Sequence, residues 1–219
     1  MPKQYSGLGR DTGGANQPQV NDIDLFGSHL DEDERTEWMQ DYLGVDESEA
    51  RTMQDAINHF TYDYEDIHWG RDEYRNDLID RVLEHPNAPV YSGEQYRGLH
   101  FDAVDMPKGV TPRQAIEKIL KSGVWKEEGA TSFSASHHVA ADNFASVNHS
   151  MNNGVDRIAM VITYKGRTGM PIKHMSDFAS ENEVLHSRKQ MTKGYDIVDY
   201  NWRSDGGAVF VTIADRKRK

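Results

Sequence analysis

Two glutamates separated by one residue form the most chemically suggestive pair in the 219-residue sequence. Glu181 and Glu183 come directly before the apolar pair Val184-Leu185, which is typical of a β-strand. Alternate residues of a strand point to the same face, so both carboxylates are expected on one face. Adjacent carboxylates repel each other unless a cation lies between them. The pair therefore indicates a site for a cationic group: an oxocarbenium-like sugar, a guanidinium or a metal ion.

An arginine and a row of hydroxyls could act on an anionic or ribose-containing partner. Arg97 precedes Gly98 in a predicted strand, and its planar guanidinium can bind a phosphate or a carboxylate with two parallel hydrogen bonds. In the segment 131–136, strand alternation puts the serines on one face and Phe133 on the other. A row of hydroxyls can orient a carboxylate or a ribose; here the row is Ser132, Ser134 and Ser136.

Each of the three segments also has an ordinary structural interpretation. A strand arginine can be an exposed residue with a partner, serines can belong to an edge strand, and two glutamates can be a solvated surface pair. The ten histidines include the pair His137-His138 but show no matched spacing with carboxylates, so no metal site is predicted. The chemistry is therefore inferred from the three segments together.

Short strands predicted beyond residue 89 would hold these residues. Irregular loops separate the strands, which favours an α+β fold over a doubly wound one. A helix is predicted over 111–121, with Thr111 as its cap and Pro112 in its first turn, and another from His138 to about Val147. The predicted strands are 90–91, 95–101, 130–136, 157–164, 181–186, 195–200 and 207–214.

The first part of the sequence predicts an acidic helical lobe over residues 31–90. Its start, Asp31-Glu32-Asp33-Glu34, suits the positive end of a helix, and three apolar stripes at helical spacing follow. Residues 1–30 carry little hydrophobic pattern and are predicted to be a flexible tail, whereas 91–219 would form the core of a single domain. The stripes are Trp38, Met39, Tyr42 and Leu43; Ala50, Met53, Ile57 and Phe60; and Tyr74, Leu78, Ile79, Val82 and Leu83.

Composition and charge exclude several classes of function. The chain has no cysteine, which excludes disulfides, thiolate metal sites and a cysteine nucleophile. No stretch approaches the roughly 20 apolar residues that span a bilayer, and the start lacks the apolar core of a secretory signal peptide. The net charge is −11 and the acids gather within 21–90, which argues against nucleic acid as the main partner and suits a basic protein partner.

In chain order, Arg97, the Ser-x-Ser segment and the Glu-x-Glu segment resemble the arginine–serine–glutamate class of mono-ADP-ribosyltransferases. This class includes actin-modifying binary toxins, arginine-specific vertebrate enzymes and transferases of tailed bacteriophages. The similarity extends over about residues 50–215, although Ala135 stands where the class usually has threonine. It implies a core of two opposed antiparallel sheets, with NAD in the cleft between them and an N-terminal helical lobe beside it.

The resemblance also implies a role for each candidate residue. Glu183 would stabilise an oxocarbenium-like ribose and hold its hydroxyl, and Ser134 would hydrogen-bond Glu183 and fix its direction. Arg97 would anchor the diphosphate or the adjoining ribose. Glu181 would grip an acceptor guanidinium and accept its proton. Phe178 would contact the surface of the acceptor protein, or serve as a small buried loop anchor.

The implied NAD site takes in further residues. Phe144 falls near the position of the aromatic residue that packs on the nicotinamide in this class. No basic residue follows it at the position that helps to hold a phosphate in some members, where residues 147–149 lie. The implied NAD-binding residues are Arg97, Gly98, Ser134, Ser136, Phe144 and Glu183, and the implied acceptor-recognition residues are Phe178 and Glu181.

The activity implied by the resemblance is transfer of ADP-ribose from NAD to an arginine of a target protein, with release of nicotinamide and no metal. Two alternatives stay open. The first is an NAD glycohydrolase, or a transferase to a non-arginine acceptor; the second is a non-enzymatic binding or virion protein on the same fold. The missing export signals and the chain size favour a bacteriophage protein, or a delivered effector, acting on host machinery in the cytoplasm.

Overall fold

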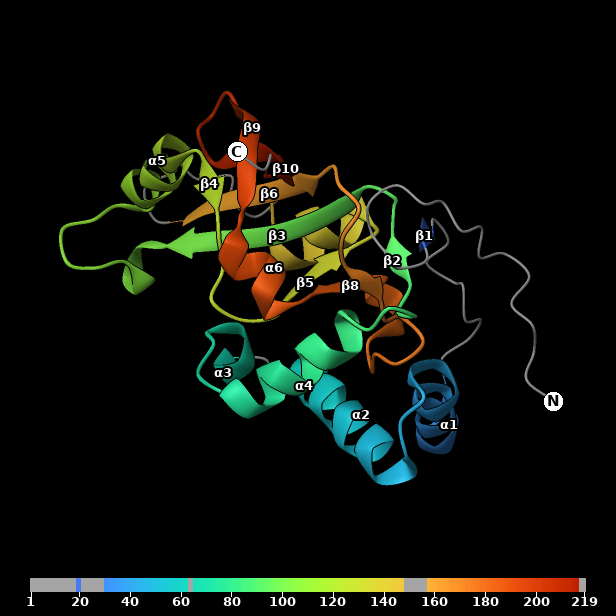
Figure 1. The fold of residues 1–219 in the computed structure, drawn as a ribbon. Coiled ribbons are helices and arrows are strands. Elements are labelled where there is room, and N and C mark those ends of the chain that lie inside the picture. Colours follow the sequence, from blue (N-terminus) through green and yellow to red (C-terminus); the bar gives the residue numbers. More distant parts are fainter. Residues whose placement is uncertain (1–18, 21–29, 63–64, 148–156, 217–219) are drawn as a thin grey trace.

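The computed structural model, which describes residues 19–20, 30–62, 65–147 and 157–216, places a group of helices beneath one large sheet (Figure 1). The helices are α1 (Glu32–Leu43), α2 (Glu47–Tyr62), α3 (Glu65–His68), α4 (Glu73–Leu83), α5 (Pro112–Ser122), α6 (Arg188–Lys193), the 3₁₀ turns η1 (Ala103–Asp105) and η3 (Ala179–Glu181), and the π-helix η2 (Val139–Phe144). The strands are β1 (Gln19–Val20), β2 (Val90–Tyr91), β3 (Gln95–Asp102), β4 (Val124–Trp125), β5 (Thr131–Ser134), β6 (Arg157–Tyr164), β7 (Met170–Pro171), β8 (Glu183–His186), β9 (Tyr195–Trp202) and β10 (Ala208–Asp215).

Helix starts follow the capping signals in the sequence. The Asp31 side chain accepts a hydrogen bond from the Glu34 backbone, and the Glu34 carboxylate accepts one from the Asp31 backbone, which together cap α1. Thr111 and Gln114 make the same reciprocal pair at the start of α5. The predicted starts of these two helices are therefore confirmed.

The large sheet has the strand order β4-β9-β10-β6-β3-β5-β8-β7. β3 and β5 are joined only at the pair Tyr96–Ser134, so the sheet divides there into a wider half ending at β3 and a narrower half of β5, β8 and β7. The predicted α+β class is confirmed. The halves meet in one sheet rather than two, and β6 and β10 run parallel because the β9–β10 hairpin returns the chain in the direction of β6.

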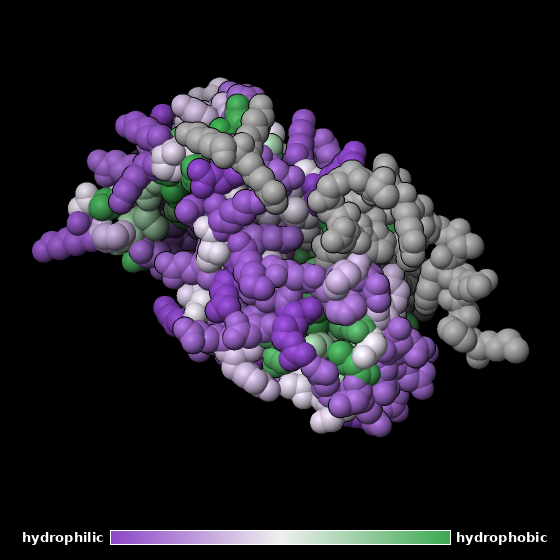
Figure 2. Space-filling model, viewed as in Figure 1, coloured by the Kyte–Doolittle hydropathy of each residue, from purple (hydrophilic) through white to green (hydrophobic). Residues whose placement is uncertain are grey.

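Three apolar clusters hold the helices and the sheet together. Residues of α1, α2 and α4 form one core with Met170 of β7 and Leu185 of β8. α5 covers one face of the wider half, and η2 covers the other through Ala141 and Ala145. The acidic helices therefore pack on the narrower half. The face of the molecule shown in Figure 2 is mainly hydrophilic, in line with the polar composition.

Several predicted boundaries differ from the structure. Within the predicted flexible tail, Gln19–Val20 forms β1, which pairs in parallel with β2; residues 1–18 and 21–29 lie outside the described residues. The predicted helix from His138 to Val147 is the shorter π-helix η2, which ends with the bond from the Ala145 backbone N–H to the Ala140 carbonyl. The predicted strand 130–136 ends at Ser134, because the chain turns away there into η2.

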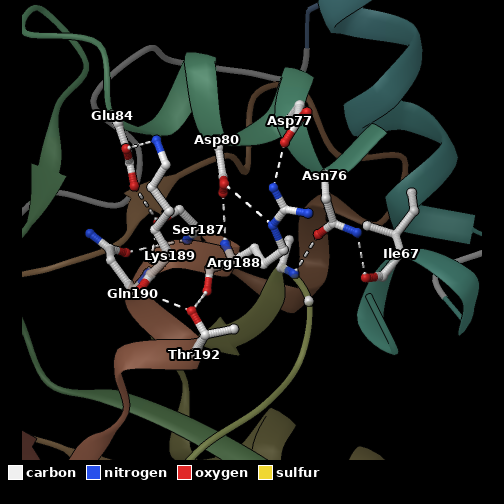
Figure 3. Close-up of polar contacts among 12 residues, drawn as sticks. Ile67, Asn76, Asp77, Asp80, Glu84, Ser187, Arg188, Lys189, Gln190 and Thr192 are labelled. Atoms are coloured by element: carbon white, nitrogen blue, oxygen red, sulfur yellow. Dashed lines mark hydrogen bonds and ion pairs between the residues drawn. The ribbon is translucent and has the colours of Figure 1, made fainter. Parts of the chain in front are cut away.

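Ion pairs between α4 and α6 fix the end of β8 (Figure 3). The buried Asp80 carboxylate accepts a hydrogen bond of 2.8 Å from the Arg188 backbone, and Asp77 pairs with the Arg188 guanidinium. Glu84 accepts hydrogen bonds from the Ser187 hydroxyl at 3.0 Å and from the Lys189 ammonium at 2.7 Å. Since α6 follows β8 directly, these contacts tie the strand that begins with a candidate glutamate to the helical layer.

The Asn76→Ala substitution is expected to destabilise the fold by about 3 kcal/mol, since it leaves buried polar groups unpaired. The fully buried Asn76 amide donates to the Ile67 carbonyl at 2.8 Å and accepts from the Ala130 backbone at 2.9 Å, which joins α4, α3 and the start of β5. The matched control is Asn87→Ala, which removes an exposed bond to the Tyr42 carbonyl. Urea unfolding that gives both variants the same midpoint would contradict this account.

Candidate active site

A pocket opens where β3 and β5 part after their single pair. It is lined by residues of β3 and β5, the ends of α2, α3 and η2, the segment 178–181 before β8, and the first residue of β8. Divergence of neighbouring strands leaves room between them that side chains and a ligand can fill. The sequence segments that stood apart by up to 86 positions therefore meet at one place. The predicted site residues that line this pocket are Arg97, Gly98, Ser134, Phe144, Phe178, Glu181 and Glu183.

Glu183 is the first residue of β8, and its side chain is buried inside the pocket wall. Burial raises the pKa of the Glu183 carboxyl to about 7, and the neighbouring Glu181 carboxylate adds to the rise. Hydrogen bonds from the hydroxyls of Ser132 and Ser176 oppose it. Glu183 is thus a carboxyl held in place by two hydroxyls and poised to change charge near neutral pH.

The prediction that Ser134 holds the Glu183 carboxyl is wrong. The Ser134 hydroxyl donates to the Glu181 backbone carbonyl at 2.5 Å and accepts from the Ser136 backbone N–H at 3.0 Å. Ser134 lies opposite Glu183 in the ladder, but the long glutamate side chain reaches the hydroxyl of Ser132, two residues further along the same face. Ser132 therefore takes the position that the sequence suggested for Ser134.

Glu181 lies in a turn before β8 and not in the strand where it was predicted. It ends the 3₁₀ turn η3, and the next residue, Asn182, adopts a left-handed conformation with φ of 49° before β8 begins. The period-two argument for the two glutamates is therefore wrong, because Glu181 is not in the strand. Both side chains nevertheless line the same pocket, and partial burial raises the pKa of Glu181.

Arg97 is held by protein groups on one side of its guanidinium. Its Nε donates to Glu127 at 2.9 Å, and its Nη1 donates to the Ser132 carbonyl at 2.7 Å across the gap between β3 and β5. The other oxygen of Glu127 lies 2.9 Å from Nε2 of His68. Burial alone would raise the pKa of Glu127, but Arg97 and His68 outweigh it and hold that pKa below its ordinary value. None of the described residues hydrogen-bonds Nη2 of Arg97, so this nitrogen can donate to a ligand.

Gly98 allows η2 to lie directly against β3. A Cβ atom at this position would stand 1.8 Å from the Ala140 carbonyl oxygen, so no other residue fits without moving the backbone. This close approach brings Phe144, at the end of η2, to the pocket with 42% of its surface exposed. Ser136 does not line the pocket; its hydroxyl accepts a hydrogen bond of 3.4 Å from the Val139 backbone at the start of η2.

Phe178 stands on a turn before β8 that we name the Phe178 turn, residues 177–181. Phe178 lines the pocket and is 46% exposed, so it is not the buried loop anchor that was one of the two expectations. The Phe178 backbone N–H donates to the Ser176 hydroxyl at 3.1 Å. Since Ser176 also hydrogen-bonds Glu183, one serine links the turn to the buried carboxyl.

Four contributors to the site were not predicted in these roles: His68, Glu127, Ser176 and, as the partner of Glu183, Ser132. No sequence pattern links these residues, because they come from α3, two different loops and β5 and meet only in the folded chain.

Among the described residues no group of three or more His, Asp or Glu side chains could hold a metal ion. Within the same ranges no helix has the length and apolar character needed to cross a bilayer.

Comparisons with known proteins identify the fold. No protein-family model matches the sequence, and a comparison with curated proteins finds no match. Among solved structures, the chain is similar to the ADP-ribosyltransferase Vis in complex with agmatine, with a TM-score of 0.54 and 18% identity over 88% of this chain and 89% of that one.

Two further structures give the same result. An ADP-ribosyltransferase from Clostridium botulinum aligns with a TM-score of 0.53 and 18% identity, over 84% of this chain and 96% of that one. ADP-ribosyltransferase HopU1 of Pseudomonas syringae aligns with a TM-score of 0.52 and 13% identity, over 84% and 87% of the two chains. The chain therefore has the fold of the ADP-ribosyltransferases.

Proposed function

We propose that this protein transfers ADP-ribose from NAD to an arginine side chain of a target protein and releases nicotinamide. The observation that carries the proposal is the meeting of Glu181, Glu183 and Arg97 in one pocket of an ADP-ribosyltransferase fold. Two carboxylates suit the two cations of this reaction, the ribose in its transition state and the acceptor guanidinium. A binding protein on the same fold has no need to keep all three groups together.

NAD would lie with its nicotinamide ribose against Glu183 and its diphosphate near Arg97. The free Nη2 edge of Arg97 suits an anionic oxygen, since Glu127 and the Ser132 carbonyl already hold the rest of the guanidinium in one orientation. The half-exposed ring of Phe144 offers a surface on which the nicotinamide can pack. Gly98 lines the pocket without a side chain, so a ligand can approach the β3 backbone there.

The first chemical step is the breaking of the bond between the ribose and the nicotinamide nitrogen. The electron pair leaves with nicotinamide, which becomes neutral, and positive charge develops on the ribose. The Glu183 carboxylate, held by Ser132 and Ser176, is aimed at that charge and accepts a hydrogen bond from a ribose hydroxyl. A fixed carboxylate that acts on charge present only in the transition state lowers the barrier without tightening substrate binding.

The second step joins the ribose to the acceptor. An arginine guanidinium is protonated at neutral pH and is a poor nucleophile, so attack requires a base that accepts its proton. Glu181 stands at the pocket edge of the Phe178 turn, where its carboxylate can bind the guanidinium and take the proton as the new N–C bond forms. The exposed Phe178 would contact the protein around the acceptor arginine.

The roles of the two glutamates are expected to be distinguishable in an assay that uses agmatine, a free guanidine, as the acceptor for labelled ADP-ribose. Glu183→Gln should lower both transfer and NAD hydrolysis by at least about 100-fold, whereas Glu181→Gln should lose transfer to the same extent and keep slow hydrolysis. Glu117→Gln, which changes an exposed carboxylate on α5, should behave as wild type. Cleavage of NAD without labelling of agmatine would indicate a hydrolase or another acceptor; no binding or consumption of NAD would remove the enzymatic proposal.

A pH profile should report the buried carboxyl. Because the pKa of Glu183 is about 7 and the ionised form acts, kcat/KM for NAD hydrolysis should rise with pH through about 7 and level off above it. Below about pH 6 the expected slope is about tenfold per pH unit. In Glu181→Gln the inflection should persist but move to lower pH, because the Glu181 carboxylate contributes to the raised pKa of Glu183, and in Glu183→Gln it should disappear. A profile that stays flat in wild type between about pH 5.5 and 8 would mean that Glu183 does not ionise in this range.

A further inference from the structure

Helix α1 and the residues just before it contact the loop that carries the Phe178 turn. The Leu30 backbone N–H, just before the helix, donates to the His174 carbonyl at 2.9 Å. The Trp38 ring packs edge-on against the His174 ring with centroids 4.9 Å apart. The Arg35 guanidinium pairs with the Asp177 carboxylate at 3.2 Å. An N-terminal helix thus supports a turn more than 130 positions away in the sequence.

Arg35 is unusual among these residues because its cationic side chain is only 6% exposed. Its Nε donates to the Leu30 carbonyl at 2.8 Å, and its Nη1 donates to the Asn58 side chain at 2.8 Å. Nη1 and Nη2 both point to the same oxygen of Asp177, at 3.3 and 3.2 Å. A buried guanidinium with its donors fixed on several sides has one orientation, so it presents Asp177 with a rigid partner.

The Phe178 turn is therefore anchored at both ends and exposed between them. At its start, Asp177 is held by Arg35; at its end, the Ser134 hydroxyl holds the Glu181 carbonyl at 2.5 Å. Inside the turn, the Glu181 backbone donates to the Phe178 carbonyl at 2.8 Å. The two residues proposed to meet the acceptor, Phe178 and Glu181, lie between these anchors.

We infer that Arg35 is a positioning residue that sets the conformation of the Phe178 turn and thereby governs use of the acceptor. The inference rests on the proposed function of Glu181. The contacts that hold Glu183 come from Ser132 and Ser176 and do not include Arg35. Ser176, which also bonds the Phe178 backbone, is fully buried, and its own backbone N–H donates to the Ile172 carbonyl at 2.9 Å, so it is held independently of Asp177. Loosening the start of the turn should therefore displace Glu181 and Phe178 while the carboxyl that acts on the ribose stays in place. A change at Arg35 should therefore impair transfer but not NAD hydrolysis, although Arg35 contacts neither substrate.

Two single variants and their combination test this inference. Arg35→Met and Asp177→Asn should each lower kcat/KM for agmatine at least about tenfold, while NAD hydrolysis without acceptor stays within about twofold of wild type. The double variant should transfer to agmatine no worse than the poorer single variant, because both changes remove the same Arg35–Asp177 pair. Equal loss of both reactions, or additive losses in the double variant, would overturn the inference.

Thr36→Val is the matched control. Thr36 is the next residue of α1, and its buried hydroxyl hydrogen-bonds the Gln54 side chain on α2 at 2.6 Å, without contact to the Phe178 turn. The variant should reduce stability yet keep the ratio of transfer to hydrolysis. A changed ratio in Thr36→Val would show that any loosening of α1 has this effect and would contradict a specific role for Arg35.

Hydrogen exchange gives a readout that does not depend on activity. Exchange of the Glu181 amide, which is bonded within the turn, should speed up in Arg35→Met and Asp177→Asn but not in Thr36→Val. Unchanged exchange in Arg35→Met would overturn the inference even if wild type labels agmatine. Faster exchange in a protein whose wild type does not label agmatine would uphold the positioning role of Arg35 and reject the proposed acceptor instead.

Discussion

The site depends on the point at which β3 and β5 part after one residue pair. A continuous ladder between them would close the space where Arg97 and Glu183 lie. Arg97 bridges the opening, since its guanidinium donates to the Ser132 carbonyl on the far strand while Glu127 and His68 hold it from the helical side. One cation thus connects the two halves of the sheet across the opening and also lines the pocket between them.

Local signals in the sequence predicted the elements well where a cap or an apolar stripe defines them. Asp31 and Thr111 begin helices as expected, and the strands that carry Arg97 and Glu183 lie where the apolar runs placed them. Alternation failed at Glu181 because the left-handed Asn182 turns the chain just before β8. A turn of this kind depends on the loop around it. The Glu-x-Glu spacing is compatible with a strand and with a turn, so it does not distinguish between them.

The residues that support the site were harder to predict than those that line it. Ser132 and Ser134 carry the same hydroxyl on the same face, and only the ladder register and the position of the Glu181 carbonyl decide which one reaches Glu183. Glu127 lies in a loop with no pattern around it, and its partners come from α3 and β3. Contacts between distant segments leave no periodic trace in the sequence, so packing alone reveals them.

Keeping Glu183 out of water also affects the balance between the folded and unfolded chain. Its pKa rises from an ordinary 4.5 to about 7 on folding, so the folded protein retains a proton that the unfolded chain releases. The stability that this proton contributes is complete below pH 4.5 and is lost as the pH rises through 7, a change of about 3 kcal/mol. At alkaline pH the fold therefore carries a buried, unneutralised charge. A cationic ligand that reaches Glu183 removes that penalty, and it should protect the protein against heat more at about pH 8 than at about pH 5.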